Sequence, residues 1–397
     1  MMRKKKIAIS HIVSGFVAVL VRFTSSVLII FQAAQNAGAN SIEMGSWIFA
    51  LGISIAITAM TFSWHFKMPI LTGWSTPGAA LLATSLSGVP MSKAVAAFMF
   101  SAFLTFLVGL TGVFERLMKS IPRTITSAML AGILMRFGLD VFSSFQNDME
   151  LVGLMLLTYL LGKRFTPRYV ILLVLMVGVM DAVSRGMFHI PRLSWHLTTP
   201  VFTMPDFHWA SLVSIGIPLF VVTMTSQNIT GLSVMTNAGF EPPASPLISW
   251  IGFCNILFAP FGCFSIGLAA ITAAICSGKE CDLNPNHRYK SVLIAGVFWI
   301  LIGLFGATVV TVFMAFPKSL VTTIAGLALF NTIGSSLSVA LYHEKDREAA
   351  MITLLITASG ISLFGVGSAF WGLLAGMTTL SLFNWHNKEE SQAASAG

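Results

Sequence analysis

The sequence predicts an all-α polytopic membrane protein whose fourteen transmembrane segments form two inverted repeats of seven, with segments 3 and 10 broken. Composition is the first observation behind this prediction. The 397 residues are 55% hydrophobic and only 10% charged, with a mean hydropathy of +0.83, whereas soluble globular domains are far less apolar. The other observations are the spacing of the apolar windows and an internal repeat that relates the two halves.

The first repeat covers residues 1–188 and holds seven apolar windows bounded by charge, Pro or Gly, at 12–34, 44–64, 69–87, 93–114, 122–141, 149–163 and 168–187. A polar link, residues 189–209, follows and is expected on the periplasmic side. The second repeat covers residues 210–385, with windows at 210–235, 246–259, 260–277, 291–315, 318–338, 349–365 and 368–384. The polar tail, residues 386–397, is predicted to be a disordered cytoplasmic extension.

The third window is interrupted in its middle by Gly73, Ser75, Thr76 and Pro77. Ser75 or Thr76 can cap a helix, and Pro77 suits the first helical position because its missing N–H costs nothing there. A helix from Pro77 to about Leu86 spans roughly half of a hydrocarbon core of about 30 Å, so its N-terminus is expected near the midplane. The unpaired N–H groups and partial positive charge of such a terminus can hold an anion.

The same arrangement recurs at 260–277, PFGCFSIGLAAITAAICS, where Ser265 corresponds to Ser75. Either segment alone is equally well explained as a tight helix start inside a packed interior. Two broken segments at matching positions favour a transporter's substrate site, because irregular backbone at membrane depth is tolerated where it lines a cavity.

Short motifs relate the two halves directly. TSS at 24–26 corresponds to TSQ at 225–227, and both are followed at the same distance by NAG, at 36–38 and 237–239. SIPRTITSAMLAG, from Ser120, likewise resembles AFPKSLVTTIAG, from Ala315. Because seven is odd, the second half enters the membrane from the opposite side, and the two halves become inverted repeats.

The charge distribution sets the expected orientation. The formal net charge is +8, and under this segment assignment 17 of the 23 Lys and Arg residues fall in one alternate set of loops and tails. This is the positive-inside bias of a membrane protein, so both termini are expected in the cytoplasm and no nucleic acid is expected as a partner.

An enzyme, a cofactor and a metal site are not expected. An intramembrane enzyme needs His, Asp or Glu clustered within the segments, but all eight histidines fall at segment ends or in loops. No Walker motif is present to bind ATP. The four cysteines, at spacings of 9, 13 and 5, form no zinc pattern.

Several longer motifs carry a family resemblance: ILTGWSTPGAALL, SAMLAGILMRFGL, TMTSQN, ASPLISW, FSIGLAAITAAIC and VGSAFWGLLAG. In this order, and over nearly the whole chain, they resemble the BenE family of bacterial benzoate/proton symporters. The resemblance implies import of benzoate or a similar aromatic carboxylate by proton symport and alternating access across the bacterial inner membrane. Related uracil/xanthine and sulfate permeases imply a core domain (segments 1–4 and 8–11), a gate domain (segments 5–7 and 12–14) and substrate bound between segments 3 and 10. A homodimer through the gate domain is left open.

The candidate substrate-binding residues are Arg22, Trp74, Ser75, Thr76, Gly78, Gln227, Asn228, Phe264, Ser265 and Gly267. The hydroxyl groups and the helix N-termini suit an anion, and the rings of Trp74 and Phe264 offer apolar surface, although buried aromatic residues more often serve packing. The adjacent amides of Gln227 and Asn228 are costly in a segment unless they are satisfied. Uracil-type relatives carry glutamates at positions that resemble Gln227 and Phe264 or Ser265, so proton coupling rests on the resemblance alone.

Arg22 is the least expected residue in the chain. It lies eleven residues inside segment 1, where a charge costs roughly 2.5 kcal/mol or more unless it faces a cavity or a partner. Either it meets the substrate carboxylate, or it marks a changed substrate preference or an impaired copy. The alternative function is therefore a nucleobase or inorganic-anion permease on the same fold.

Overall fold

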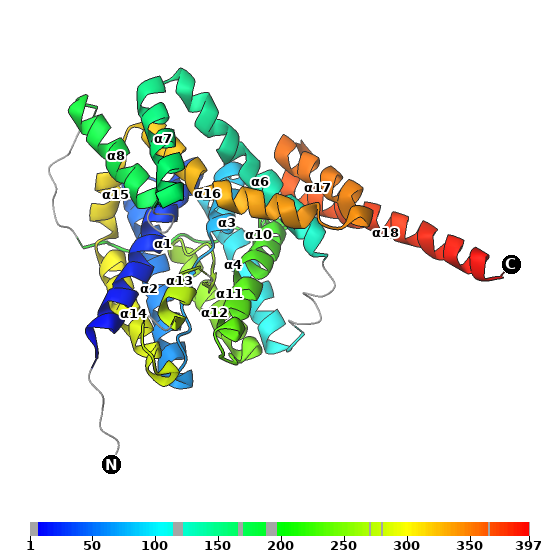
Figure 1. Ribbon diagram of the computed structural model, residues 1–397, viewed down its shortest axis with the longest axis horizontal. Coiled ribbons are helices and arrows are strands. Elements are labelled where there is room, and N and C mark those ends of the chain that lie inside the picture. Colours follow the sequence, from blue (N-terminus) through cyan, green and yellow to red (C-terminus); the bar gives the residue numbers. More distant parts are fainter. Residues whose placement is uncertain are drawn as a thin grey trace, which may run out of the picture.

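The computed structural model describes residues 7–113, 122–165, 170–187, 197–269, 271–278, 281–363 and 366–396 (Figure 1). In the first half the elements are α1 (Ile9–Asn36), α2 (Ser41–Phe66), β1 (Thr72–Trp74), α3 (Thr76–Ser85), α4 (Met91–Leu110), α6 (Arg123–Ser143), α7 (Met149–Phe165) and α8 (Val170–Ser184). A 3-10 turn, Ser144–Gln146, lies between α6 and α7. Each of the seven segments predicted for this half thus contains a helix.

The second half repeats this order. A continuous helical stretch comes first and consists of α9 (Trp209–Ser211), a π-helical turn (Leu212–Gly216), α10 (Ile217–Thr223), a second π-helical turn (Met224–Asn228) and α11 (Ile229–Asn237). It is followed by α12 (Ala244–Phe258), β2 (Ile266–Leu268), α13 (Ile271–Ser277), α14 (Tyr289–Leu304), α15 (Gly306–Met314), α16 (Lys318–Ala340), α17 (Arg347–Ser359), β3 (Ser362–Leu363), β4 (Val366–Gly367) and α18 (Ser368–Ala396). Three further 3-10 turns occur at Ala259–Phe261, Pro285–His287 and Glu344–Asp346.

Helix length and composition confirm a polytopic membrane protein. Among the described residues, seven helices are long and apolar enough to cross a bilayer, or eight if the two parts of α1 form one span. Those parts, Ile9–Phe23 and Ser26–Asn36, are bent by 41°. Shorter apolar helices, such as α8, contribute to the same bundle.

Contacts between two helices recur between their counterparts in the other half, as a two-fold relation between the halves requires. α2 packs against α14, and their counterparts α12 and α4 pack against each other. α7 pairs with α8 and α17 pairs with α18, at opposite sides of the view in Figure 1. α6 packs against its own counterpart α16, and β1 pairs with β2. The internal repeat seen in the sequence is therefore also a repeat of elements and contacts.

The repeated NAG motif forms the same helix end twice. α1 ends at Asn36 and α11 at Asn237, and in each case the glycine two residues later has a positive φ, 78° at Gly38 and 85° at Gly239. Ala39 N–H donates to Ala34 O, and Phe240 N–H donates to Met235 O, both at 3.0 Å. This is the C-terminal motif in which glycine supplies the left-handed residue, which explains why the motif recurs.

Four details differ from the sequence-based expectation. The helix of the third segment begins at Thr76, and Ser75 is its N-cap, so Pro77 occupies the second helical position rather than the first. The predicted segment 349–365 is helical only to Ser359, because Gly360 takes a left-handed conformation (φ 68°) that ends α17 before β3.

The predicted segment 291–315 is two helices, α14 and α15, because the link between the halves inserts at their junction: Thr198 N–H donates to Leu304 O at 2.8 Å, and Ala307 N–H donates to Thr198 Oγ1 at 3.0 Å. The tail, expected to be disordered, continues α18 to Ala396 and projects from the bundle (Figure 1). Its Glu, Gln, Lys and Ala residues favour helix, and extending an existing helix requires no new nucleation.

Candidate functional site

Segments 3 and 10 meet as a pair of short antiparallel strands. The register of β1 and β2 is Thr72 with Leu268, Gly73 with Gly267, and Trp74 with Ile266. The pairing continues on both sides, since Ser75 N–H donates to Ser265 O at 3.0 Å and Ala269 N–H donates to Leu71 O at 2.8 Å. Neither segment is a continuous helix: each is a three-residue strand followed by a short helix, α3 or α13. The pairing brings Ser75 and Ser265 together.

Buried side chains satisfy the outer edges of this strand pair. Asn255 of α12 makes two hydrogen bonds of 3.0 Å with Ile266, donating to its carbonyl and accepting from its N–H. Asn228 accepts from Leu268 N–H at 2.9 Å. Because a strand edge inside an apolar bundle has no water to bond, these amides replace the neighbouring strands that a larger sheet would supply.

Trp74 O is the point where the two most polar candidates converge. Gln227 Nε2 of the second repeat donates to it at 2.9 Å, and the Arg22 guanidinium of the first repeat also donates to it. Arg22 is 8% exposed, and its guanidinium lies against Gly73, where a Cβ atom would stand within 3.0 Å of it. Only glycine at position 73 leaves room for this approach. The Arg22 guanidinium thus lies at the strand pair, over Gly73 and within hydrogen-bonding distance of Trp74 O.

Three hydroxyl groups form a chain next to this carbonyl. Ser265 Oγ donates to Thr223 Oγ1 at 3.1 Å, and Thr223 Oγ1 donates to Ser75 Oγ at 3.0 Å. Ser75 Oγ also accepts from Gly78 N–H at 3.0 Å, which is the N-cap bond of α3. All three side chains are buried. The chain connects the two strand–helix segments through the helix that contains Gln227.

The two candidate rings are packed rather than open. Trp74 is fully buried, its centroid is 4.8 Å from that of Trp299, and its indole N–H donates to Ser26 Oγ at 2.8 Å. Phe264 is 1% exposed, and its ring contacts those of Trp47 and Phe98, at centroid distances of 6.0 and 6.4 Å.

The remaining candidates lie around the same point. Thr76 is the first residue of α3 and is partly exposed. A Cβ atom at Gly78 would stand 2.8 Å from Ser75 Oγ, and one at Gly267 would stand 2.8 Å from Asn228 Oδ1, so both glycines admit close polar neighbours. The structure therefore brings all ten candidates to the strand pair or into contact with it.

Sequence reasoning missed Thr223 and Asn255. A single Thr or Asn in an apolar helix is unremarkable, but the repeat offered a signal for Thr223. The offset of 201 that relates Thr24 to Thr225 also relates Arg22 to Thr223. Thr223 thus occupies the position of Arg22 in the second repeat, and its hydroxyl bridges Ser75 and Ser265.

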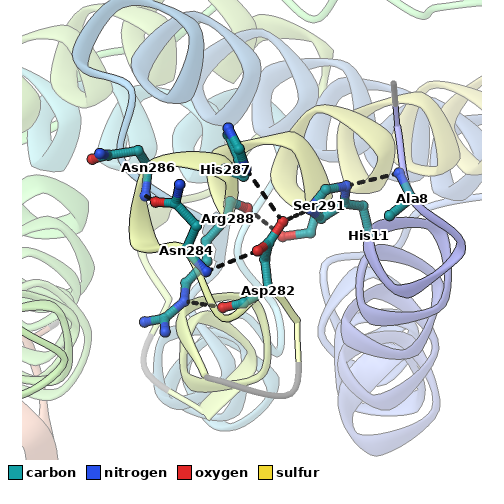
Figure 2. Close-up of polar contacts among 8 residues, drawn as sticks. All are labelled: Ala8, His11, Asp282, Asn284, Asn286, His287, Arg288 and Ser291. Atoms are coloured by element: carbon teal, nitrogen blue, oxygen red, sulfur yellow. Dashed lines mark hydrogen bonds and ion pairs between the residues drawn. The ribbon is translucent and has the colours of Figure 1, made fainter. Parts of the chain in front are cut away.

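A second polar cluster ties the start of α1 to the loop after α13 (Figure 2). His11 Nε2 lies 2.9 Å from Asp282 Oδ2, while His11 Nδ1 accepts from Ala8 N–H at 3.1 Å, so Nε2 carries the proton and donates. Arg288 donates to Asp282 O at 2.8 Å and to Ser277 O, the end of α13, at 2.7 Å. This cluster fixes the end of α13 that lies away from the strand pair.

Helices long enough to span a bilayer, arranged as two halves around buried polar residues on short strands, define a membrane transporter. The model of the BenE family, described as benzoate membrane transport protein, matches residues 5–382, and the chain belongs to this family. Inner membrane protein YdcO of Escherichia coli (strain K12) is 43% identical over 365 residues, which is 92% of this chain and 93% of that protein. The benzoate membrane transport protein of Acinetobacter baylyi is 38% identical over 374 residues, 94% of this chain and 95% of that protein.

Solved structures show the fold alone, because their sequence identities are low. The transmembrane domain of a cyanobacterium bicarbonate transporter, BicA, aligns with a TM-score of 0.60 at 14% identity and covers 93% of this chain and 97% of that domain. SLC26A9 aligns with a TM-score of 0.63 at 12% identity, over 96% of this chain and 66% of that protein. The chain is therefore a multi-pass membrane transporter with an SLC26-like fold.

Proposed function

We propose that this chain imports benzoate or a similar aromatic carboxylate by proton symport across the bacterial inner membrane, with both termini in the cytoplasm. The substrate binds where the β1–α3 and β2–α13 segments meet. The names of the family and of the Acinetobacter baylyi relative support benzoate as the substrate.

The convergence of two donors on Trp74 O is the single observation that carries the proposal. Arg22 and Gln227 both donate to this one neutral carbonyl, next to the Ser75 hydroxyl. A carboxylate offers two charged acceptor oxygens. It would make the Gln227 hydrogen bond charge-assisted, about twice as strong as a neutral one, and could bind the planar Arg22 guanidinium through two parallel bonds. A carboxylate arriving beside Trp74 can accept hydrogen bonds from these same donors. Its aromatic ring can contact Trp74 and Phe264 only after the site opens, because both rings are buried in this structure.

Proton symport is taken from the family resemblance, and the energetics of importing an anion are compatible with it. Moving one negative charge into a cell against a membrane potential costs about 2.3 kcal/mol per 100 mV. A proton that enters with each carboxylate makes the step electroneutral and adds the proton gradient as a driving force. The enclosed residues also require alternating access, since Ser75 and Asn228 are fully buried. We propose that a core domain of segments 1–4 and 8–11 moves against a gate domain of segments 5–7 and 12–14.

Counterflow of labelled benzoate in proteoliposomes tests the proposal. Vesicles loaded with unlabelled benzoate should accumulate external label transiently, and an inward-directed proton gradient should raise the initial rate. Excess unlabelled benzoate should abolish uptake, whereas uracil and sulfate should not. Competition by uracil or sulfate instead would identify a nucleobase or inorganic-anion permease, and uptake that does not saturate would indicate a channel.

A further inference from the structure

The hydroxyl of Thr223 is used differently from those of its neighbours on the same helical stretch. Thr225 donates to Val221 O at 2.8 Å, and Ser226 and Thr230 also donate to carbonyls of their own helix. Thr223, which is 2% exposed, instead donates across to Ser75 of the other repeat and accepts from Ser265. A β-branched residue in a helix normally satisfies its hydroxyl on the preceding turn, so this outward bond is a specific arrangement.

We propose that Thr223 is a positioning residue that aims the Ser75 hydroxyl proton at the carboxylate of the bound substrate. The inference deepens the proposed function and rests on it. Ser75 Oγ accepts two hydrogen bonds, one from Thr223 and one from Gly78 N–H, both at 3.0 Å. A hydroxyl oxygen has two lone pairs and one proton, so the two bonds use both lone pairs and leave one direction for the Ser75 proton.

The direction of the chain also matters for its strength. Ser265 donates to Thr223, and Thr223 donates to Ser75, so these two hydrogen bonds run in the same direction. Aligned hydrogen bonds polarise one another and make the last hydroxyl a better donor. The last hydroxyl is that of Ser75, which lies one residue after Trp74, the residue whose carbonyl receives Arg22 and Gln227.

The repeat supports the same role. By the offset of 201, Thr223 and Gln227 in the second half correspond to Arg22 and Ser26 in the first. All four side chains meet Trp74 or Ser75: Arg22 and Gln227 donate to Trp74 O, Ser26 accepts from the Trp74 indole, and Thr223 donates to Ser75. Thr223 therefore lies on the face that approaches the candidate site from both repeats.

Benzoate binding to the purified, full-length protein tests the inference, measured by calorimetry or with labelled benzoate. Thr223→Val removes the hydroxyl at nearly constant volume and should raise the Kd roughly 2- to 10-fold, the range for one lost hydrogen bond. Thr223→Ser keeps the hydroxyl and should bind as the wild type does. Thr225→Val is the matched control, because its hydroxyl bonds only its own helix, and it should leave the Kd unchanged.

A double-mutant cycle with Ser75→Ala separates positioning from a general structural effect. Ser75→Ala should raise the Kd roughly 10- to 150-fold, because it removes a donor to a charged group. If Thr223 acts through Ser75, adding Thr223→Val to Ser75→Ala should change the Kd no further. A full additional loss in the double variant would assign Thr223 a packing role and overturn the inference.

Folding is checked by size-exclusion profile and melting temperature, and Thr223→Ala replaces the valine variant if that variant does not fold. Wild-type protein that binds no benzoate would overturn the proposed function together with the inference. Wild-type protein that binds benzoate, with equal Kd values for Thr223→Val and Thr225→Val, would overturn the inference alone.

Discussion

Arg22 shows how a charged residue is kept inside this bundle. Its guanidinium lies over Gly73 and donates to Trp74 O, which lowers the cost of taking the charge out of water. A carbonyl compensates a guanidinium less well than a carboxylate does, and a planar guanidinium can bind a carboxylate through two parallel bonds. In the proposed function, the carbonyl holds the guanidinium in place and a substrate carboxylate would bind it more strongly.

Arg22→Ala should raise the apparent KM for benzoate by roughly 10- to 150-fold, the range for losing a hydrogen bond to a charged group. The KM for a neutral analogue such as benzyl alcohol should change little. Arg22→Lys keeps the charge without the planar guanidinium, so its KM for benzoate should lie between those of the wild type and Arg22→Ala. Initial uptake rates in proteoliposomes measure the KM of each protein for both compounds. An equal effect on benzoate and on the neutral analogue would exclude a counter-charge role.

Residue types predicted part of the candidate site and missed the rest for a physical reason. Ser75, Gln227 and Asn228 attract attention because polar groups in an apolar window need partners. The partners themselves, such as Trp74 O and the Ile266 backbone, come from other segments, and no local pattern contains that information. In the sequence Thr223 resembles an ordinary helix residue, because only the structure shows that its hydroxyl donates to Ser75 rather than to its own helix.

Among the elements, the strand pair depends on side chains for its outer hydrogen bonds. Asn255 satisfies both backbone groups of Ile266, and Cys263 Sγ lies 3.5 Å from Asn255 Oδ1. Broken backbone in a bundle of this kind is stable only when each exposed N–H and C=O has a partner. The fold therefore relies on α12 as well as on the pairing of β1 with β2.

Asn255→Ala should destabilise the protein strongly because it leaves the buried N–H and C=O of Ile266 without partners, at about 1–3 kcal/mol for each group. Ser249→Ala on the same helix is the control, since Ser249 donates to Ser245 O of its own helix at 2.9 Å. Melting temperatures in detergent should drop much further for Asn255→Ala. Similar drops for both variants would show that the strand edge does not need this amide.

Apolar windows located the helices well but could not locate their interruptions. The break between α14 and α15 depends on Thr198, more than a hundred residues earlier, which satisfies the two backbone groups released there. The two π-helical turns, Leu212–Gly216 and Met224–Asn228, likewise have no local composition signal. The second turn carries Gln227 and Asn228, in line with the frequent occurrence of such turns at functional sites.

The cluster in Figure 2 predicts a pH dependence at the end of α13. Burial alone raises the pKa of Asp282, but hydrogen bonds from Asn284 N–H and His11, together with electrostatic attraction to the His11 and His287 imidazoles, lower it overall. A carboxyl whose pKa is lower in the folded state adds stability above its unfolded pKa of about 3.9, and this stability is lost as the pH falls through the folded pKa.

The wild type should therefore melt at a higher temperature than Asp282→Asn near pH 6, and the difference should shrink below about pH 4. Asparagine keeps an acceptor for Asn284 N–H but removes the charge that faces His11. Melting curves of both proteins in detergent between pH 3 and pH 7 measure the difference. A difference that stays constant over this range would show that the charge of Asp282 does not stabilise the fold.

At the scale of the whole molecule, the two halves are interleaved. α2 of the first half packs on α14 of the second, α12 packs on α4, and the strands of the two halves pair with each other. Each half buries its packing surface against the other half, so the repeats form one folded unit around the strand pair. The periodic spacing of windows predicted this order of elements, whereas the exchange of partners follows only from the three-dimensional contacts.

Two single-cysteine positions test the inverted arrangement in the membrane. Phe207, at the end of the link, is 60% exposed, and Tyr342, after α16, is 75% exposed. The link is expected in the periplasm. The loop after α16 is expected in the cytoplasm, because the basic residues gather on its side of the membrane. A membrane-impermeant maleimide should thus label Phe207→Cys in intact cells and label Tyr342→Cys only after permeabilisation. The four native cysteines are buried, so background labelling should be low. Labelling of both positions from the same side would contradict the predicted segments 8–12, because these five crossings should place the two positions on opposite sides.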